Sequence, residues 1–372
     1  MIATAPLAIT GCGVVSPAGT GMERLAELLD GPAVTAAAPA PVDSDTPDGE
    51  SYPPISVHMV PEIALADHVG RKGTRRLDRM VGHALIASRL ALASAGRSDE
   101  AAPRSRTGVA VGTSTGSIRS LTEIATDTLT QDEPYNIAPS RFPNTVLNSC
   151  AGQIAIWNSL GGVNSTLAGG HVSSTSALRF AHNAIRHNHA TSMLVGGIEE
   201  LSPQLAWAWH RSGVLRADAS LGEGCALLVA EHPEVVGDRR VLAELLGTEV
   251  GYFGSQPRRT SIARGLAARI ERLLARGGVS AAEIDVVSLG GGSQIGVRGI
   301  EEQAVRIALG FMPERSRITD VLGECFSAGG ALQAAALLAR WDGERRPSER
   351  HALVTSLGRD GTAGCFLLRR TG

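Results

Sequence analysis

The sequence lacks the features that mark several large classes of protein. Its five cysteines are scattered and form no C-x-x-C pair, which argues against both a disulfide framework and a zinc site. No run of about eighteen apolar residues is present, so the sequence predicts no membrane span. The chain does not open on a basic region followed by an apolar run, and we expect a cytoplasmic protein.

The chain also lacks an excess of either positive or negative charge. The 35 basic and 37 acidic residues give a net charge of −2, which provides no overall field for a polyanion, and we expect no nucleic-acid partner. Neither G-x-G-x-x-G nor G-x-x-x-x-G-K-[ST] occurs, and the histidines have no ligand partners at a recognised metal-binding spacing. We therefore predict no metal and no cofactor.

What is present is an alternation of short apolar strands with amphipathic helices, which predicts an α/β protein with a mostly parallel sheet covered by helices on both faces. A Pro- and Asp-rich stretch at 36–56 is expected to be an exposed loop. The segment GCALL at 224–228 recurs as GCFLL at 364–368, which favours a duplicated α/β unit. We predict two closely packed halves, residues 1–235 and 236–372.

One short motif points to hydrolysis. Residues 112–116 (GTSTG) match G-x-S-x-G, and a strand before the turn with a helix after it is the setting of a nucleophile elbow. Ser114 would be the nucleophile of an independent acyltransferase or serine hydrolase. No H-G-G-G stretch precedes the motif to complete an oxyanion hole, and small residues at a tight turn explain the match equally well.

Several segments, taken in order, resemble the β-ketoacyl-ACP synthase family of the thiolase-like superfamily. They span nearly the whole chain: ITGCGVVSPAG at 9–19, FPNTV at 142–146, MLVGGIE at 193–199, GEG at 222–224 and SLGRDGT at 356–362. The resemblance implies a duplicated thiolase-like fold in five layers, αβαβα. It also implies a family chemistry in which a cysteine at a helix N-terminus takes up the acyl chain and two histidines assist the condensation.

All three of these catalytic positions are changed in this chain. The resemblance sets the cysteine position at His171, within AGGHVSS at 168–174. It sets the first histidine at Gly290 and the second at Glu324, within GECFSAGG at 323–330. For His171 three interpretations stay open: a residual general base, a weak acyl acceptor, or a buried, hydrogen-bonded placeholder.

A chain that keeps the family's sequence segments but has lost all three catalytic residues resembles the chain-length factor of type II polyketide systems. This subunit has no condensing activity of its own, forms a heterodimer with the ketosynthase α subunit and meets acyl carrier protein through that complex. The resemblance implies that the tunnel or partner interface contains Thr115, Ile118, Arg119, Ser140, Arg141, Phe142 and Thr145. In the entrance loop, Arg359 replaces an apolar gate residue and Asp360 lies beside it.

Overall fold

A computed structural model describes residues 5–31, 51–98, 104–254, 258–342, 346 and 348–371. Most of the predicted loop at 36–56 lies outside the described residues. Within them, an 11-stranded sheet has the strand order β11-β10-β12-β13-β9-β1-β8-β6-β4-β5, and β2 pairs with β1. Its strands are β1 (Leu7–Ser16), β2 (Gly19–Thr20), β4 (Thr107–Gly112), β5 (Asn164–Leu167), β6 (Ser192–Glu199), β8 (Gly224–Glu231), β9 (Ala243–Tyr252), β10 (Val286–Leu289), β11 (Glu314–Ser316), β12 (His351–Leu357) and β13 (Thr362–Arg370).

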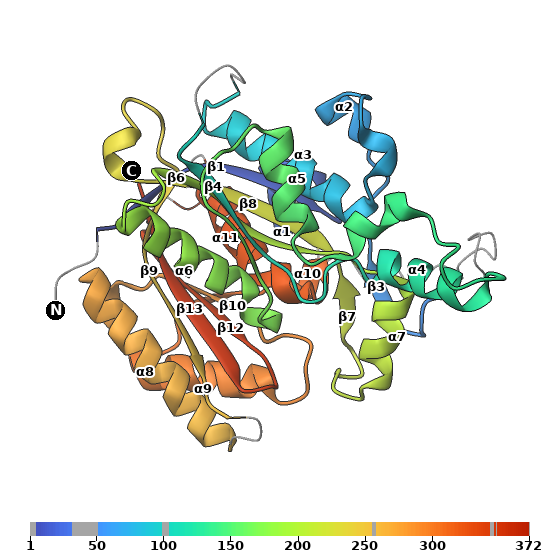
Figure 1. Ribbon diagram of the computed structural model, residues 1–372. Coiled ribbons are helices and arrows are strands. Elements are labelled where there is room, and N and C mark those ends of the chain that lie inside the picture. Colours follow the sequence, from blue (N-terminus) through green and yellow to red (C-terminus); the bar gives the residue numbers. More distant parts are fainter. Residues whose placement is uncertain are drawn as a thin grey trace.

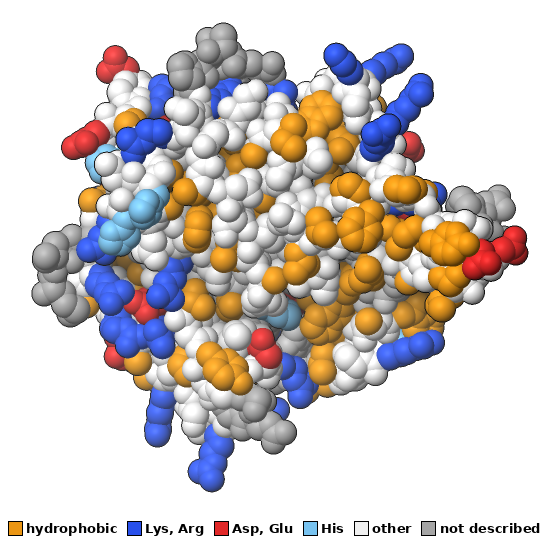
Figure 2. Space-filling model, in the orientation of Figure 1, with side chains coloured by type: hydrophobic (Ala, Val, Ile, Leu, Met, Phe, Trp, Pro, Cys, Tyr) orange, Lys and Arg blue, Asp and Glu red, His pale blue; other side chains and the backbone are white. Residues whose placement is uncertain are grey.

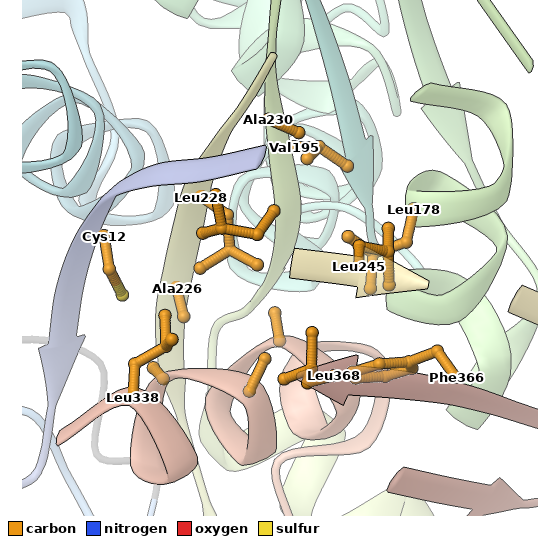
Figure 3. Packing of buried hydrophobic residues seen from close by; sticks show 14 of the residues in the cluster. Cys12, Leu178, Val195, Ala226, Leu228, Ala230, Leu245, Leu338, Phe366 and Leu368 are labelled. Carbon is orange, nitrogen blue, oxygen red and sulfur yellow. The ribbon is translucent and has the colours of Figure 1, made fainter. Parts of the chain in front are cut away.

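Helices cover this sheet in three sets, each with its own apolar core (Figure 1). One core joins α3 and α5 to the strands of the first half, and another joins α8 and α9 to those of the second. Between the halves, α6 and α11 pack against both sets of strands, as the residues labelled in Figure 3 illustrate. The bounds of these helices are α3 (Arg79–Ser94), α5 (Ser149–Trp157), α6 (Ser173–Arg186), α8 (Arg259–Gly277), α9 (Val297–Leu309) and α11 (Gly329–Trp341). The result is five layers, αβαβα.

The remaining elements lie around this frame. Strands β3 (Ser56–His58) and β7 (Ser220–Gly222) form a separate parallel pair. The smaller helices are α1 (Met22–Asp30), α2 (Leu65–Val69), α4 (Ile118–Thr130), α7 (Pro203–Arg211) and α10 (Thr319–Leu322). The predicted boundary at 235/236 falls between β8 and β9, and the division into two domains stays a prediction.

The contact between β1 and α3 shows how local sequence determines this packing. All ten residues of β1 are buried, as expected for a strand covered on both faces. A Cβ atom at Gly13 would lie 2.0 Å from the carbonyl oxygen of Ala87 in α3, so only glycine allows the helix so close. Asp78 fixes the start of that helix, because its carboxylate accepts a hydrogen bond from Val81 N at 2.8 Å.

The prediction of a mostly parallel sheet is wrong, because the sheet is mixed. Strand β4 is parallel to β5 and β6, and β10 is parallel to β11 and β12, but β8 is antiparallel to both β1 and β6. A short turn joins β12 to β13, and so direct a return places the second strand antiparallel to the first. The hydrophobic periodicity of the sequence predicted the strand–helix–strand crossovers that make strands parallel. It does not report the connections that make neighbouring strands antiparallel.

Candidate functional site

Around one pocket between the two halves, the structure brings together the three positions that the resemblance assigns to the family's catalytic residues. His171, Gly290 and Glu324 all line this pocket. The pocket volume is about 10 Å³, which is room for about one water molecule. His171 lies in the short 3₁₀ turn η3 (Gly170–Val172) that leads directly into α6.

His171 is held by polar neighbours on one side of its ring. Its Nε2 atom lies 2.8 Å from the side-chain amide of Gln294 and 3.7 Å from Glu324 Oε1. Its side chain is 12% exposed, so little solvent reaches these contacts. The arrangement orients the imidazole toward Gln294, a residue that the sequence analysis did not single out.

Aromatic side chains enclose the other side of the imidazole. Trp209 and Phe326 present their rings to His171 at centroid distances of 6.0 and 5.7 Å, and the two rings stack on each other at 4.5 Å. Phe326 has a φ of 42°, in the left-handed region that a bulky residue rarely adopts. Burial of its ring and a hydrogen bond from its backbone N to Glu324 Oε1, at 3.1 Å, accompany this conformation. Sequence reasoning also missed this pair, because a tryptophan and a phenylalanine more than a hundred residues apart carry no local signal.

Glu301 fixes the turn that contains Gly290. Gly290 N and Gly291 N donate to its two carboxylate oxygens at 3.1 and 2.9 Å, and the Thr355 hydroxyl donates at 2.6 Å. Burial raises the pKa of Glu301 to about 7 despite these bonds. The carboxyl group is therefore engaged with backbone amides and a hydroxyl.

Ser114 has an environment unlike that of a hydrolase nucleophile. Its hydroxyl donates to Oε2 of the buried Glu199 at 2.5 Å, and the same oxygen accepts from the backbone N and the hydroxyl of Ser327. Burial raises the pKa of Glu199 to about 7. All ten histidines lie in the described part of the chain, and no imidazole bonds to Ser114 there. The G-x-S-x-G match thus lacks the serine–histidine pair that the hydrolase interpretation needs.

The entrance-loop residues lie beside the turn that contains His171. Arg359 and Asp360 are exposed, and Asp360 Oδ1 accepts from the backbone N and the hydroxyl of Thr362 at 3.0 and 2.6 Å. Asp360 Oδ2 lies 3.9 Å from the place that a Cβ of Gly170 would occupy. A charged loop therefore borders the pocket.

The predicted tunnel or interface residues lie away from the pocket, around the start of α4 and the 3₁₀ segment η2 (Pro139–Thr145). Thr115, Ser140, Arg141 and Phe142 are exposed, and Ile118, Arg119 and Thr145 are half-buried. Ile118 packs in the apolar cluster that also contains Phe326, which connects this region to the pocket. Their role in a tunnel or an interface stays a prediction.

None of the five cysteines, all of which are described, is available as a replacement nucleophile. Every one is a free thiol and buried. Burial raises the pKa of Cys12 to about 12 and that of Cys325, which lines the pocket, well above its usual range. Within the described residues there is no cluster of metal ligands, and no helix is long and apolar enough to cross a bilayer.

Comparison with known proteins identifies the family to which the fold around this pocket belongs. The family model described as "Beta-ketoacyl synthase, N-terminal domain" matches residues 4–229. The chain belongs to the beta-ketoacyl synthase family. A solved chain of the ishigamide ketosynthase/chain length factor is 31% identical, with a TM-score of 0.83 over 99% of this chain and 100% of that one.

Two further comparisons cover most of the chain, one by sequence and one by fold. The 3-oxoacyl-[acyl-carrier-protein] synthase 2 of Rhizobium meliloti (strain 1021) is 28% identical over 365 residues, 88% of this chain and 84% of the relative. A beta-ketoacyl synthase from Burkholderia phymatum STM815, 22% identical, superposes with a TM-score of 0.82 over 99% of this chain and all of that one. The predicted family and its thiolase-like α/β fold are thus confirmed.

Proposed function

We propose that this beta-ketoacyl synthase family member is a non-condensing subunit, a chain-length factor that pairs with an active ketosynthase in type II polyketide or related acyl-chain biosynthesis. The observation that carries the proposal is the small size of the pocket. His171 stands where the family resemblance sets the reacting thiol, it contacts Gln294, and about 10 Å³ remains around it. A space of one water molecule cannot hold an acyl chain.

An apolar face supplies a surface for the partner. It is formed by neighbouring segments of α4, η2 and α5, and Figure 2 shows hydrophobic side chains gathered there, on the right of the molecule. Strand β5 ends the sheet nearby and pairs only with β4 among the described strands, so its outer edge is open. The exposed apolar residues are Leu121, Leu129, Tyr135, Phe142, Val146, Leu147 and Ile156.

We assign this face to a ketosynthase of the same fold. An open strand edge beside an apolar surface can extend one sheet into the sheet of a partner, provided that the partner presents a matching edge. The ishigamide ketosynthase/chain length factor, by its name, couples the two kinds of subunit, and it is 31% identical to this chain. Thr115, at the turn after β4, is exposed close to the start of α4, where the partner's tunnel would meet this chain.

A basic loop beside this face suits an acidic carrier protein. Arg71, Lys72, Arg75 and Arg76 are exposed and have no ion pair with any described residue. The loop is connected to η2 through a hydrogen bond from Asn144 Nδ2 to Arg76 O at 3.1 Å. The curated relatives are named for acyl-carrier-protein substrates, and we propose that acyl carrier protein reaches the cytoplasmic complex at this loop.

The test is the length of the product made by the reconstituted complex. The chain is co-expressed with its partner ketosynthase and acyl carrier protein, and Thr115→Phe is compared with the wild type. We expect a shorter product, because the larger ring removes tunnel volume without changing the partner's nucleophile. The substitution is expected to weaken the complex by about 1–3 kcal/mol, so complex formation is measured first by sedimentation.

Thr260→Phe is the matched control, because Thr260 is exposed on α8 in the outer layer of the second half. It should leave both the complex and the product length unchanged. An intact Thr115→Phe complex with an unchanged product would contradict the chain-length role. Condensation by the isolated chain would contradict the non-condensing assignment.

A further inference from the structure

Part of one strand edge on the second half is open. Strand β9 pairs with β13 along its whole length but with β1 only through residues 243–245. From Gly247 to Tyr252, no described strand pairs with the other edge of β9. Helix α6 and helix α8 lie on the two sides of this segment (Figure 1), and Thr175 of α6 packs over Gly364 beside Glu249. We call this region, between α6 and α8, the arginine edge.

On the α8 side of the arginine edge, the arginines outnumber the carboxylate that they bind. Glu249 is 7% exposed and accepts hydrogen bonds from Arg269 at 3.2 Å, Arg272 at 3.3 Å and Arg276 at 2.5 Å. The three arginines lie along one stripe of the helix at i, i+3 and i+7. One carboxylate cannot neutralise three guanidinium groups, so about two positive charges remain for an outside partner.

The α6 side adds two more arginines. Arg179 and Arg186 follow Thr175 by four and eleven residues, so they project from the side of α6 next to the buried Thr175, along the border between the packed and the exposed faces of the helix. Both are exposed, and neither has an ion pair among the described residues. In Figure 2 basic side chains gather on the left of the molecule, over α6, β9 and α8, around a few acidic ones.

We infer that the arginine edge docks an extended acidic segment of a partner protein, which pairs with the open edge of β9. The unpaired N–H and C=O groups from Gly247 to Tyr252 supply main-chain hydrogen bonds, and alternate side chains of an added strand face the arginines of α6 and those of α8. Charge complementarity selects the acidic partner. The arginine edge lies on elements outside the apolar face of the proposed ketosynthase contact, so each proposal can fail without the other.

The test measures binding of a labelled peptide to the intact chain by fluorescence anisotropy. The probe is a fluorescein-labelled peptide of about 12 residues that repeats Glu-Glu-Thr-Thr, so that glutamates face both α6 and α8, and it is long enough to span the open edge. We expect saturable binding that weakens as salt is raised toward about 0.5 M. Arg272→Glu and Arg179→Glu should each weaken binding about tenfold, because each reverses a charge on one side of the edge.

Two controls separate charge from strand pairing. Arg264→Glu, on α8 and exposed without an ion pair among the described residues, should leave binding unchanged. The same peptide with methylated backbone nitrogens keeps its charge but loses main-chain donors, and it should bind at least about fivefold more weakly. If Arg272→Glu fails to fold, Arg179→Glu still decides the question, because Arg179 has no described ion pair to lose.

Three outcomes would overturn the inference. Equal binding of a labelled single-stranded oligonucleotide would mean a general polyanion site rather than an acidic protein segment. Unchanged affinity of the methylated peptide would remove the strand pairing. Absence of peptide binding, with Arg272→Glu and Arg179→Glu forming larger assemblies, would mean that the arginines protect an exposed edge from self-association.

Discussion

The five cysteines are all buried, so they contribute to packing rather than present a reactive thiol. Each cysteine is at most 5% exposed, and none lies at the helix N-terminus where the resemblance sets the reacting group. An apolar environment disfavours the thiolate, which is the nucleophilic form. Burial raises the pKa of Cys150, near the apolar face, and of Cys325, in the pocket, well above the usual range of a thiol.

We therefore expect the native chain to resist thiol alkylation. Incubation with iodoacetamide at pH 8, followed by mass spectrometry of the intact protein, should show no adduct while the chain stays folded. In denaturant all five cysteines should react. Rapid modification of a single cysteine in the native state would show an accessible thiolate and would reopen the assignment of this subunit as non-condensing.

At the scale of elements, α5 and β5 combine structural and proposed functional roles. Helix α5 buries Cys150, Ala151 and Ile154 against the first half, while Ile156 on the opposite side is 71% exposed. An apolar side chain so exposed contributes little to folding of the isolated chain. Its burial against a partner would contribute about 1.5–3 kcal/mol to association.

Ile156→Asp should accordingly disrupt pairing with the ketosynthase without unfolding the chain. We expect at least about a tenfold loss of affinity in sedimentation or titration calorimetry, because a buried aspartate without a partner is costly. Ile307→Asp is the control, since Ile307 is also exposed but lies on α9 in the other outer layer. Equal effects of the two substitutions would move the partner contact away from the apolar face.

Some secondary-structure elements and contacts could be predicted from the sequence, and others could not. The strand β1 and the helix α3 were predictable because a continuous apolar run and a capped run of helix-forming residues are local patterns. The antiparallel strands were not, because pairing direction depends on connections that periodicity does not report. The resemblance located His171, Gly290 and Glu324, whereas Gln294 meets His171 across 123 residues and has no pattern of its own.

Across the whole molecule, buried carboxyl groups join the two halves and link folding to pH. Glu199 ends β6 in the first half and accepts hydrogen bonds from Ser327 in the second. Burial raises the pKa of Glu199, Glu200 and Glu301 to about 7, from an ordinary value of 4.5. Between these values the folded chain keeps protons that the unfolded chain releases, so these groups favour folding at low pH and lose that effect as pH rises toward 7.

A histidine works in the opposite direction. Burial and the nearby Arg79 lower the pKa of His83 to about 3, so the folded chain keeps this histidine neutral at pH values where the unfolded chain protonates it. The folded state therefore loses stability as the pH falls below about 6.5. The pH profile of the wild type alone therefore mixes two opposed effects. A substitution that removes one carboxyl group isolates its contribution, because the histidine effect is common to both proteins and cancels in the difference.

Glu199→Gln is the substitution that makes this separation. At pH 5 the wild-type carboxyl group is already neutral in the folded state, and the amide should cost about 1–2 kcal/mol through imperfect hydrogen bonds with Ser114 and Ser327. At pH 8 the folded wild type must hold a buried carboxylate whose Oε1 has no hydrogen-bond partner, a penalty of up to about 3 kcal/mol that the amide avoids. The free energy of unfolding of the variant relative to the wild type, measured with urea at both pH values, should therefore rise from pH 5 to pH 8.

Glu283→Gln is the control: Glu283 is exposed, and hydrogen bonds from Ser280 lower its pKa, so no gain in the free energy of unfolding at high pH is expected. A constant difference between Glu199→Gln and the wild type would mean that Glu199 is ionised throughout and that the junction of the halves holds a charge.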